Sequence, residues 1–233
     1  MKNLNGKVAV ITGAAGGMGV EIASMLAKEG VKLALFDFSA DKLAALRESL
    51  GDAEIFTAVV DVRDEAQVAA AMKNAAEALG APSILLNLAG LSIPAKLWEM
   101  AEADFDTTMY VNVKGTFLAS KHFASVAAEE ECRIINIGSM AAKRANANAP
   151  LYCTAKAAVN MLSAGMQMQF KDKNIRVTTL NPGGADTGFW GDRPVKRENL
   201  LKTSDVAEVM LFVLTRESRV AFSEINFESF LMM

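Results

Sequence analysis

Residues that form cross-links or metal sites are scarce in this sequence. Its 233 residues include two cysteines, Cys132 and Cys153, and a single histidine, His122. The cysteines are far apart and form no CxxC pair, and His122 has no cysteine or carboxylate partner at ligand spacing. This pattern argues against a disulfide framework and a zinc site, so we expect no metal, and it favours a reducing compartment.

Long apolar runs and an excess of basic charge are lacking as well. No apolar run reaches the length of a membrane span, and a strand pattern that starts at Lys7 leaves no room for a signal peptide. The net charge of −3 and the pI of about 5.4 argue against nucleic acid or an anionic membrane as the main partner. We therefore expect a soluble, cytoplasmic protein that acts on a small molecule.

A regular alternation of strand and helix patterns is present instead. Short apolar runs predict strands at Lys7–Thr12, Val31–Phe36, Glu54–Val60, Ile84–Leu88, Arg133–Ile137, Ile175–Leu180 and Ala221–Phe227. Helical patterns lie between them, at Met18–Glu29, Asp41–Leu50, Asp64–Leu79, Asp104–Glu129, Leu151–Phe170 and Ser204–Thr215. This order indicates the α/β class: a single-domain, Rossmann-like, doubly wound parallel sheet of about seven strands with helices on both faces. We expect one domain over residues 1–233, with residues 183–203 as a loop that covers the substrate.

A glycine-rich turn, residues 12–19, joins the first strand to the first helix. Backbone amides in such a turn can approach a pyrophosphate, and the N-terminus of the following helix stabilises its negative charge. The alternative is a plain strand–helix turn, since short glycine patterns recur by chance. The position of the turn between the first strand and the first helix favours nucleotide binding.

Asp37 stands at the end of the second strand, where an acid that binds a ribose diol is expected. A carboxylate there accepts hydrogen bonds from the diol and repels a 2′-phosphate, and no Arg or Lys lies immediately beside it. The alternative is an aspartate that caps a turn or a helix. The sequence therefore favours NAD over NADP.

Tyr152 and Lys156 lie four residues apart in a predicted helix and hence on one face of it. An ammonium beside a phenol lowers the phenol's pKa from about 10, which makes Tyr152 a usable acid–base near neutral pH. Ser139 follows the fifth strand, at the edge where parallel sheets bind ligands, and its hydroxyl can bond a substrate oxygen. A surface Tyr–Lys pair and a loop-capping serine are the alternatives.

Five separated motifs together resemble the short-chain dehydrogenase/reductase family. They are the Thr-Gly-x-x-x-Gly-x-Gly turn at 12–19, Asn87-Leu88-Ala89-Gly90, Ser139, the Tyr152/Lys156 pair and Asn181-Pro182-Gly183. Nearly the whole chain matches in order and spacing, including the thirteen-residue step from Ser139 to Tyr152. The resemblance implies an NAD(H)-dependent oxidoreductase that interconverts a secondary alcohol and a ketone, or a primary alcohol and an aldehyde, by hydride transfer.

The resemblance also implies a role for each matching residue. The implied catalytic residues are Asn112, which supports a proton-relay water, Ser139, Tyr152 and Lys156. The implied cofactor contacts are Gly13, Ala15, Gly17, Met18, Gly19, Asp37, Asp61, Val62, Asn87, Ala89, Gly90, Tyr152, Lys156, Pro182, Gly183 and Thr187. For the substrate pocket we expect Ser92, Ala141, Asn146, Ala149, Phe189, Trp190 and Arg193.

Two features depart from the family pattern. Leu88 replaces a usual asparagine, and residues 223–233 end on apolar side chains instead of the common Gly-Gly, which puts a borrowed subunit arrangement in doubt. The predicted helix Leu151–Phe170 nevertheless has an apolar arc over more than half of its circumference, with Ala158, Met161, Gly165 and Met168 as a second row. We therefore expect a homodimer or a homotetramer.

The sequence leaves the substrate and two alternatives open. The basic cluster of Arg193, Lys196 and Arg197 is either a solvated surface or a site for an anionic group of the substrate. The rival functions are a regulator that senses NAD without turnover and a sugar-nucleotide epimerase or dehydratase. The complete catalytic set argues against the regulator, and the short C-terminal region argues against the epimerase.

Overall fold

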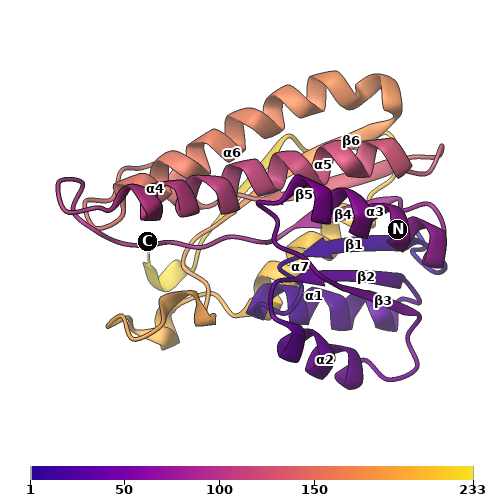
Figure 1. Cartoon of the computed structure of the whole chain (residues 1–233), viewed down its shortest axis with the longest axis horizontal. Coiled ribbons are helices and arrows are strands. Elements are labelled where there is room, and N and C mark those ends of the chain that lie inside the picture. Colours follow the sequence, from indigo (N-terminus) through magenta and orange to yellow (C-terminus); the bar gives the residue numbers. More distant parts are fainter. Residues whose placement is uncertain (1, 233) are drawn as a thin grey trace.

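Seven parallel strands form one sheet at the centre of the structure, a computed structural model that describes residues 2–232. The strands lie in the order β3-β2-β1-β4-β5-β6-β7 (Figure 1). Their bounds are β1 Val8–Thr12, β2 Lys32–Asp37, β3 Ile55–Val59, β4 Ile84–Asn87, β5 Cys132–Ile137, β6 Ile175–Pro182 and β7 Glu224–Phe227. The strand order reverses direction between β1 and β4, the place where sheets of this kind bind ligands.

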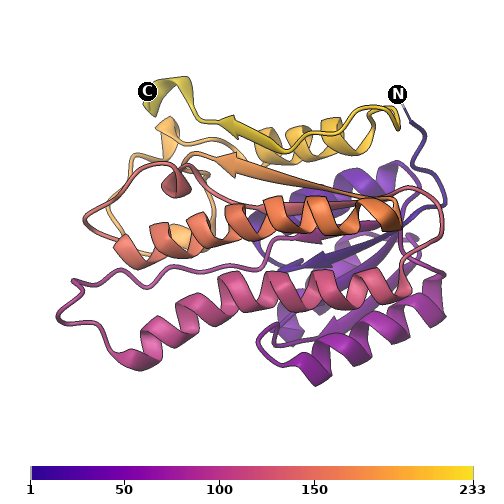
Figure 2. The ribbon, with the colours of Figure 1, turned by 90° about the horizontal axis from the view of Figure 1, so that it is seen from above.

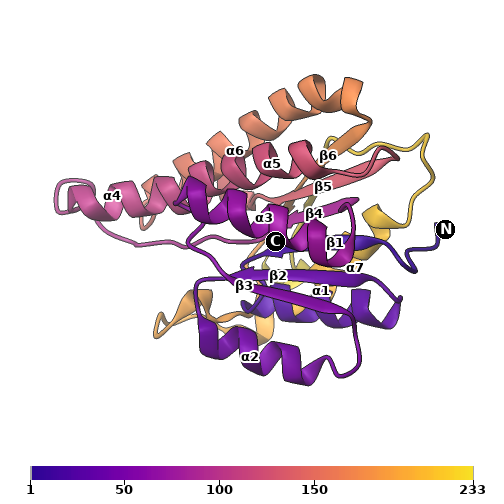
Figure 3. The same ribbon diagram turned by 45° about the vertical axis from the view of Figure 1, so that its right-hand side comes forward.

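Helices cover both faces of the sheet. On one face lie α1 Gly17–Lys28, α2 Ala40–Ser49 and α7 Thr203–Leu214 (Figures 1 and 3). On the other lie α3 Glu65–Leu79, α4 Glu102–Met109, α5 Gly115–Val126 and α6 Pro150–Gln169. Every residue of β1 and β5 is buried, as parallel strands between two helical layers must be. The predicted doubly wound sheet of seven strands is therefore confirmed.

Each face of the sheet has its own apolar core. Leu26 of α1 and Met210 of α7 pack in the first core, and Met72 of α3 and Phe123 of α5 pack in the second. Within residues 2–232, no helix is both long and apolar enough to cross a bilayer. The strands thus form a rigid base, and the loops at their carboxyl ends are left to form a site.

The single long helix predicted over 104–129 is interrupted in the structure. A π-helical segment, η1 Tyr110–Lys114, separates α4 from α5, although the three follow one course (Figure 2). The side-chain amide of Asn112 donates to the Thr108 carbonyl at 2.9 Å, and the Thr116 hydroxyl donates to the Asn112 carbonyl at 2.8 Å. These bonds stabilise the wider turn, a feature that often marks functional positions in helices.

The predicted loop over residues 183–203 contains two short 3₁₀ turns, η4 Gly188–Trp190 and η5 Arg197–Asn199. A β-bridge between Ala185 and Leu201 closes its base. Because the segment leaves the carboxyl end of β6 and returns to α7, it folds over the ligand-binding edge of the sheet.

Candidate active site

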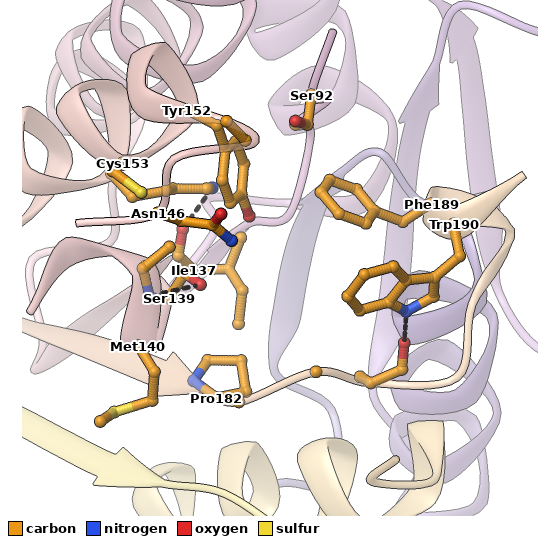
Figure 4. A pocket seen from close by; sticks show the side chains of 18 of the residues that line it. Ser92, Ile137, Ser139, Met140, Asn146, Tyr152, Cys153, Pro182, Phe189 and Trp190 are labelled. Atoms are coloured by element: carbon orange, nitrogen blue, oxygen red, sulfur yellow. Dashed lines mark hydrogen bonds between the residues drawn. The ribbon is translucent and has the colours of Figure 1, made fainter. Parts of the chain in front are cut away.

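A cavity of about 500 Å³ opens at the carboxyl ends of β4, β5 and β6 (Figure 4). Residues after β5, the first turn of α6 and the loop after β6 form its walls. Figure 4 shows Tyr152, Ser139 and Asn146 on one side of the cavity, with Phe189 and Trp190 on the other. Three of the four predicted catalytic side chains, Ser139, Tyr152 and Lys156, line this one cavity.

The glycine-rich turn lies next to the cavity and has the geometry of an anion cradle. Gly13 has φ +65°, and a Cβ on it would stand 2.7 Å from the Ala89 backbone nitrogen, so no other residue fits there. Helix α1 begins without a side-chain cap and has no acidic residue in its first turn. Its first backbone N–H groups are therefore available to a phosphate, which fits the pyrophosphate of a dinucleotide.

Asp37 lies beside this turn at the end of β2 and is 7% exposed. Its carboxylate accepts hydrogen bonds from the backbone N–H groups of Ala15, at 3.0 Å, and Ser39, at 3.1 Å. These bonds fix a negative charge at the open end of the turn. The sequence placed the ribose-binding acid at this position.

Tyr152 is at the start of α6, where the helix opens onto the cavity. Burial raises the pKa of its phenol to about 12, although the neighbouring Ser139 hydroxyl and the charge of Arg193 act to lower it. The Ser139 hydroxyl also accepts a hydrogen bond from the Ala141 N–H at 3.1 Å, which fixes its direction. Ser139 and Tyr152 thus form a pair of hydroxyls at one end of the cavity.

Lys156 lies one turn further along α6 and is 3% exposed. Its ammonium donates to the Ile137 carbonyl at 2.9 Å and lies 5.7 Å from the centre of the Tyr152 ring. Burial lowers the pKa of Lys156 to about 8. The sequence predicted that this ammonium lowers the pKa of Tyr152. In the chain by itself the pKa of Tyr152 is instead raised by burial, and the groups that act to lower it are Ser139 and Arg193.

Asn112 does not line the cavity. Its side chain lies against Gly90, which does line the cavity. A Cβ on Gly90 would stand 2.9 Å from the Asn112 Oδ1 atom and 3.4 Å from the Lys156 Nζ atom. The Asn112 side chain is fully buried and donates to the Leu91 carbonyl at 2.8 Å, whereas its Oδ1 atom has no hydrogen-bond partner within residues 2–232. The predicted catalytic four therefore converge, with Asn112 on the far side of Gly90.

All the residues predicted for the substrate pocket line the cavity: Ser92, Ala141, Asn146, Ala149, Phe189, Trp190 and Arg193. Phe189 contacts Tyr152, with 5.3 Å between the ring centres, and meets Trp190 edge to face at 5.7 Å. The Trp190 indole N–H donates to the Ala185 carbonyl at 2.8 Å, which anchors this aromatic wall to the base of its loop.

Several cofactor residues predicted from the family lie beside the cavity, and others lie further along the sheet edge. Met18, Gly90, Pro182, Gly183 and Thr187 line it. Thr187 reaches the glycine-rich turn, because a Cβ on Gly17 would stand 3.1 Å from its methyl group. Those outside the cavity lining are Gly13, Ala15, Gly17, Gly19, Asp37, Asp61, Val62, Asn87 and Ala89.

Two of these outlying residues have partners for their side chains within the chain. Asn87 is 3% exposed, and its amide donates to the Ser120 hydroxyl and to Asn136 Oδ1 inside the sheet, whereas its own Oδ1 atom has no hydrogen-bond partner within residues 2–232. Asp61 forms an ion pair with Arg63, which holds the pKa of its carboxyl below the usual value. Its carboxylate is therefore already engaged within the chain.

Some residues of the cavity carry no signal in the sequence. Cys153 lies beside Tyr152 in the first turn of α6, and both line the cavity, although its position alone does not predict this. Met140, Arg144, Ala145 and Ala147 could have been suspected, since they lie between two predicted catalytic residues. Gly184 and Ala185 belong to the loop predicted to cover the substrate, whereas Met232 has no such signal.

Known proteins with related sequences and structures identify the family of this chain. The model of the short chain dehydrogenase family matches residues 7–198. An uncharacterized oxidoreductase of Staphylococcus saprophyticus is 31% identical over 230 residues, which cover 97% of this chain and 98% of the relative.

Two solved structures of similar proteins contain nicotinamide cofactors. An alcohol dehydrogenase from Thermococcus sibiricus, complexed with 5-hydroxy-NADP, is 29% identical, with a TM-score of 0.89 and 97% coverage of both chains. A short-chain dehydrogenase/reductase from Burkholderia phymatum, in complex with NAD, is 27% identical, with a TM-score of 0.88 and coverage of 97% of this chain and 90% of that one. The protein belongs to the short-chain dehydrogenase/reductase family of oxidoreductases, as the motifs predicted.

Proposed function

We propose that the protein is an NAD(H)-dependent oxidoreductase that interconverts a secondary alcohol and a ketone, or a primary alcohol and an aldehyde. The observation that carries this proposal is that Ser139, Tyr152 and Lys156 line one cavity, next to the glycine-rich turn. The cytoplasm is the proposed location, because both cysteines are free and neither is paired.

The cavity residues divide the work of the reaction among them. When bound, the nicotinamide cofactor would supply or accept the hydride. The Ser139 hydroxyl would hold the substrate oxygen, and the Tyr152 hydroxyl would give it a proton in reduction or take one in oxidation. Gly13 and the start of α1 would hold the pyrophosphate, Asp37 the adenosine ribose, and Lys156 the nicotinamide ribose.

The pKa values of the chain favour one half of this cycle near neutral pH. With a pKa raised to about 12 by burial, Tyr152 keeps its proton and presents an acid to a bound carbonyl. Alcohol oxidation needs the phenolate, so its rate should rise as the pH is raised. Carbonyl reduction should depend little on pH until the pH approaches the pKa of Tyr152, because the phenol stays protonated below it.

Replacement of Tyr152 by phenylalanine is the decisive test. Tyr152→Phe should lower kcat by roughly a hundredfold or more, because it removes the proton donor, while the Kd of NADH stays within about twofold. Tyr110→Phe is the matched control, since Tyr110 is the other tyrosine of the chain and does not line the cavity.

The measurements are absorbance of the reduced nicotinamide during turnover and fluorescence titration of NADH. Unchanged turnover in Tyr152→Phe would refute the assigned mechanism. A wild-type protein that binds NADH tightly but turns over no alcohol or carbonyl in a broad screen would support the sensing regulator instead.

We further propose a homodimer or a homotetramer. One side of α6 packs inward, with Val159 and Met166 buried. Met161 and Met168, on the second apolar row of the helix, are 75% and 80% exposed. Phe117 on the neighbouring helix α5 is 44% exposed. A second subunit would cover these side chains, as large exposed apolar groups on adjacent helices favour.

A further inference from the structure

The charge of the cavity is entirely of one sign. Of its described lining residues, Arg144, Lys156 and Arg193 are basic, and none carries a carboxylate. A low-dielectric cavity with such a lining attracts anions and repels cations. The three basic groups differ, however, in whether the protein itself neutralises them.

Two of the three have a partner or a role within the chain. Arg144 forms an ion pair with Glu228 at 2.6 Å, and the Glu228 side chain is only 11% exposed. Lys156 donates to the Ile137 carbonyl and belongs to the proposed catalytic group. Arg144 is therefore neutralised within the chain, and Lys156 already has a role in the proposed reaction.

Arg193 has no ion-pair partner within residues 2–232 and is nevertheless held firmly in place. Its guanidinium donates to the carbonyls of Trp190 and Phe189 and stacks on both rings, 4.8 Å from the Phe189 centre and 5.2 Å from that of Trp190. Its Nη1 group makes no hydrogen bond to the described part of the chain. A guanidinium fixed along one edge, with donors left on the other, is preorganised for a carboxylate.

The position of Arg193 relative to the reacting group follows from Phe189. The Phe189 ring touches Tyr152 on one hand and Arg193 on the other. An anion on Arg193 therefore lies in the same cavity as the atom bonded to Tyr152, and the charge of Arg193 acts on the Tyr152 phenol. Ser92, whose buried hydroxyl has no partner within residues 2–232, offers a neutral hydrogen bond in the same cavity.

The basic cluster noted in the sequence is split by the fold. Arg197 pairs with Asp186 at 2.5 Å, and neither Arg197 nor Lys196 lines the cavity. Only Arg193 of the three turns inward. Lys196 and Arg197 therefore fit a solvated surface, whereas Arg193 fits a binding site.

We infer that the substrate is a hydroxy or oxo acid whose carboxylate binds Arg193 while its alcohol or carbonyl carbon reacts at Tyr152. This inference rests on the proposed function, because it names the substrate class of the same site. A competing use of Arg193, contact with a phosphate of the cofactor, predicts a different outcome in the experiment below.

The test compares linear oxo acids of four to eight carbons with their methyl esters, in the presence of NADH. Wild type should show a lower KM for the acid of the best length than for its ester. Arg193→Gln, which keeps a polar side chain without the charge, should raise the KM for that acid by roughly ten- to a hundredfold and leave the ester within about twofold. Arg193→Lys should recover part of the preference. Arg197→Gln, a charge removed from the same loop outside the cavity, is the matched control.

Binding without turnover separates the failure of this inference from the failure of the proposed function. With NADH present, hexanoate should raise the unfolding temperature of wild type more than hexanamide does, and Arg193→Gln should abolish that difference. Equal effects of acid and amide on wild type would overturn the anion subsite even if alcohol turnover is found. A weaker Kd of NADH in Arg193→Gln would assign Arg193 to the cofactor and overturn the inference too. If Arg193→Gln fails to fold, the comparison of hexanoate with hexanamide on wild type decides. Equal shifts of the unfolding temperature would then refute the inference.

Discussion

At the scale of single residues, the active site holds a charge that the fold disfavours. The Lys156 ammonium is almost completely buried and has no carboxylate partner within residues 2–232, and its pKa is lowered by burial to about 8. A pKa lower in the folded than in the unfolded chain means that protonated Lys156 costs folding free energy. The position therefore serves chemistry at the expense of stability.

Lys156→Met should stabilise the protein while it abolishes turnover. A shift from 10.5 to about 8 corresponds to about 3 kcal/mol, and loss of the bond to the Ile137 carbonyl returns about 1 kcal/mol of it. The unfolded chain binds more protons between these two values, so wild-type stability from this group rises with pH there. The advantage of the variant should be full below pH 8 and vanish towards pH 10.5.

Urea unfolding of both proteins across that range measures the effect. Lys73→Met, at a lysine whose side chain is 72% exposed, is the control and should show no such dependence on pH. A Lys156→Met variant that is less stable than wild type at pH 7 would contradict this account.

Asp37 makes a second prediction at the residue scale, on cofactor choice. Asp37→Asn removes the charge and keeps one oxygen, so it can accept from only one of the Ala15 and Ser39 N–H groups, which bond different carboxylate oxygens. The ratio of kcat/KM for NAD over that for NADP should fall by roughly tenfold or more, since a repulsive charge beside the 2′-phosphate is gone. Asp41→Asn, in the exposed first turn of α2, should leave the ratio unchanged. Steady-state rates with both cofactors give the answer, and an unaltered ratio would remove Asp37 from the ribose site.

Residue types and spacing predicted which side chains lie together in this site, but not what packs around them. The Tyr152/Lys156 spacing and Ser139 suffice to place three side chains together, because a helix turn and a strand end have fixed geometry. The pKa of Tyr152 was mispredicted, since burial depends on everything packed around the phenol and not on one neighbour. The ion pair of Arg144 with Glu228 could not be predicted either, because the two residues are distant in sequence.

At the scale of elements, the turn between β1 and α1 combines two constraints on one glycine. Gly13 has a positive φ and also lies against the Ala89 backbone, whereas Gly51 has φ +60° with nothing near its absent Cβ. Comparison of the two separates backbone strain from steric clash. Gly51→Ala should cost about 1 kcal/mol. Gly13→Ala should cost more and should weaken NADH binding at least tenfold, because the β1 and β4 ends move apart.

Thermal unfolding and NADH titration of both variants check this prediction. If Gly13→Ala binds NADH as tightly as wild type, the turn is not the pyrophosphate site. If Gly51→Ala also lost binding, the effect would be one of global stability.

The predicted elements match the structure where one period dominates the pattern. Apolar runs such as β1 and β5 and the amphipathic α3 fall within a residue or two of the expected bounds. The break at η1 was missed, because a π-helical segment depends on side-chain bonds such as those of Asn112 and Thr116 and leaves the apolar pattern intact. Likewise, nothing in the sequence of the C-terminal segment places Met232 in the cavity.

At the scale of the whole molecule, helix α6 joins the active site to the outer surface. Its first turns carry Tyr152 and Lys156, and its outward face presents Met161 and Met168 to solvent in the single chain. Specific interfaces bury about 800 Å² on each partner around an apolar centre. A second subunit on α5 and α6 would meet that description and would also hold rigid the helix on which the acid–base is mounted.

Met161→Glu combined with Met168→Glu should therefore reduce the size of the assembly. Two carboxylates at the centre of an apolar contact would lose their hydration and gain no partner. This costs several kcal/mol, which is more than the burial of the two side chains contributes to association. Sedimentation of the double variant should show a smaller species than wild type, with a lower kcat if the interface steadies α6. Val59→Glu, at an apolar side chain that is 58% exposed on the edge strand β3, is the control and should leave the size unchanged. A wild-type protein that sediments as a monomer at micromolar concentration would contradict the prediction. The two methionines would then face solvent, and α6 would be held in place by the packing within one chain.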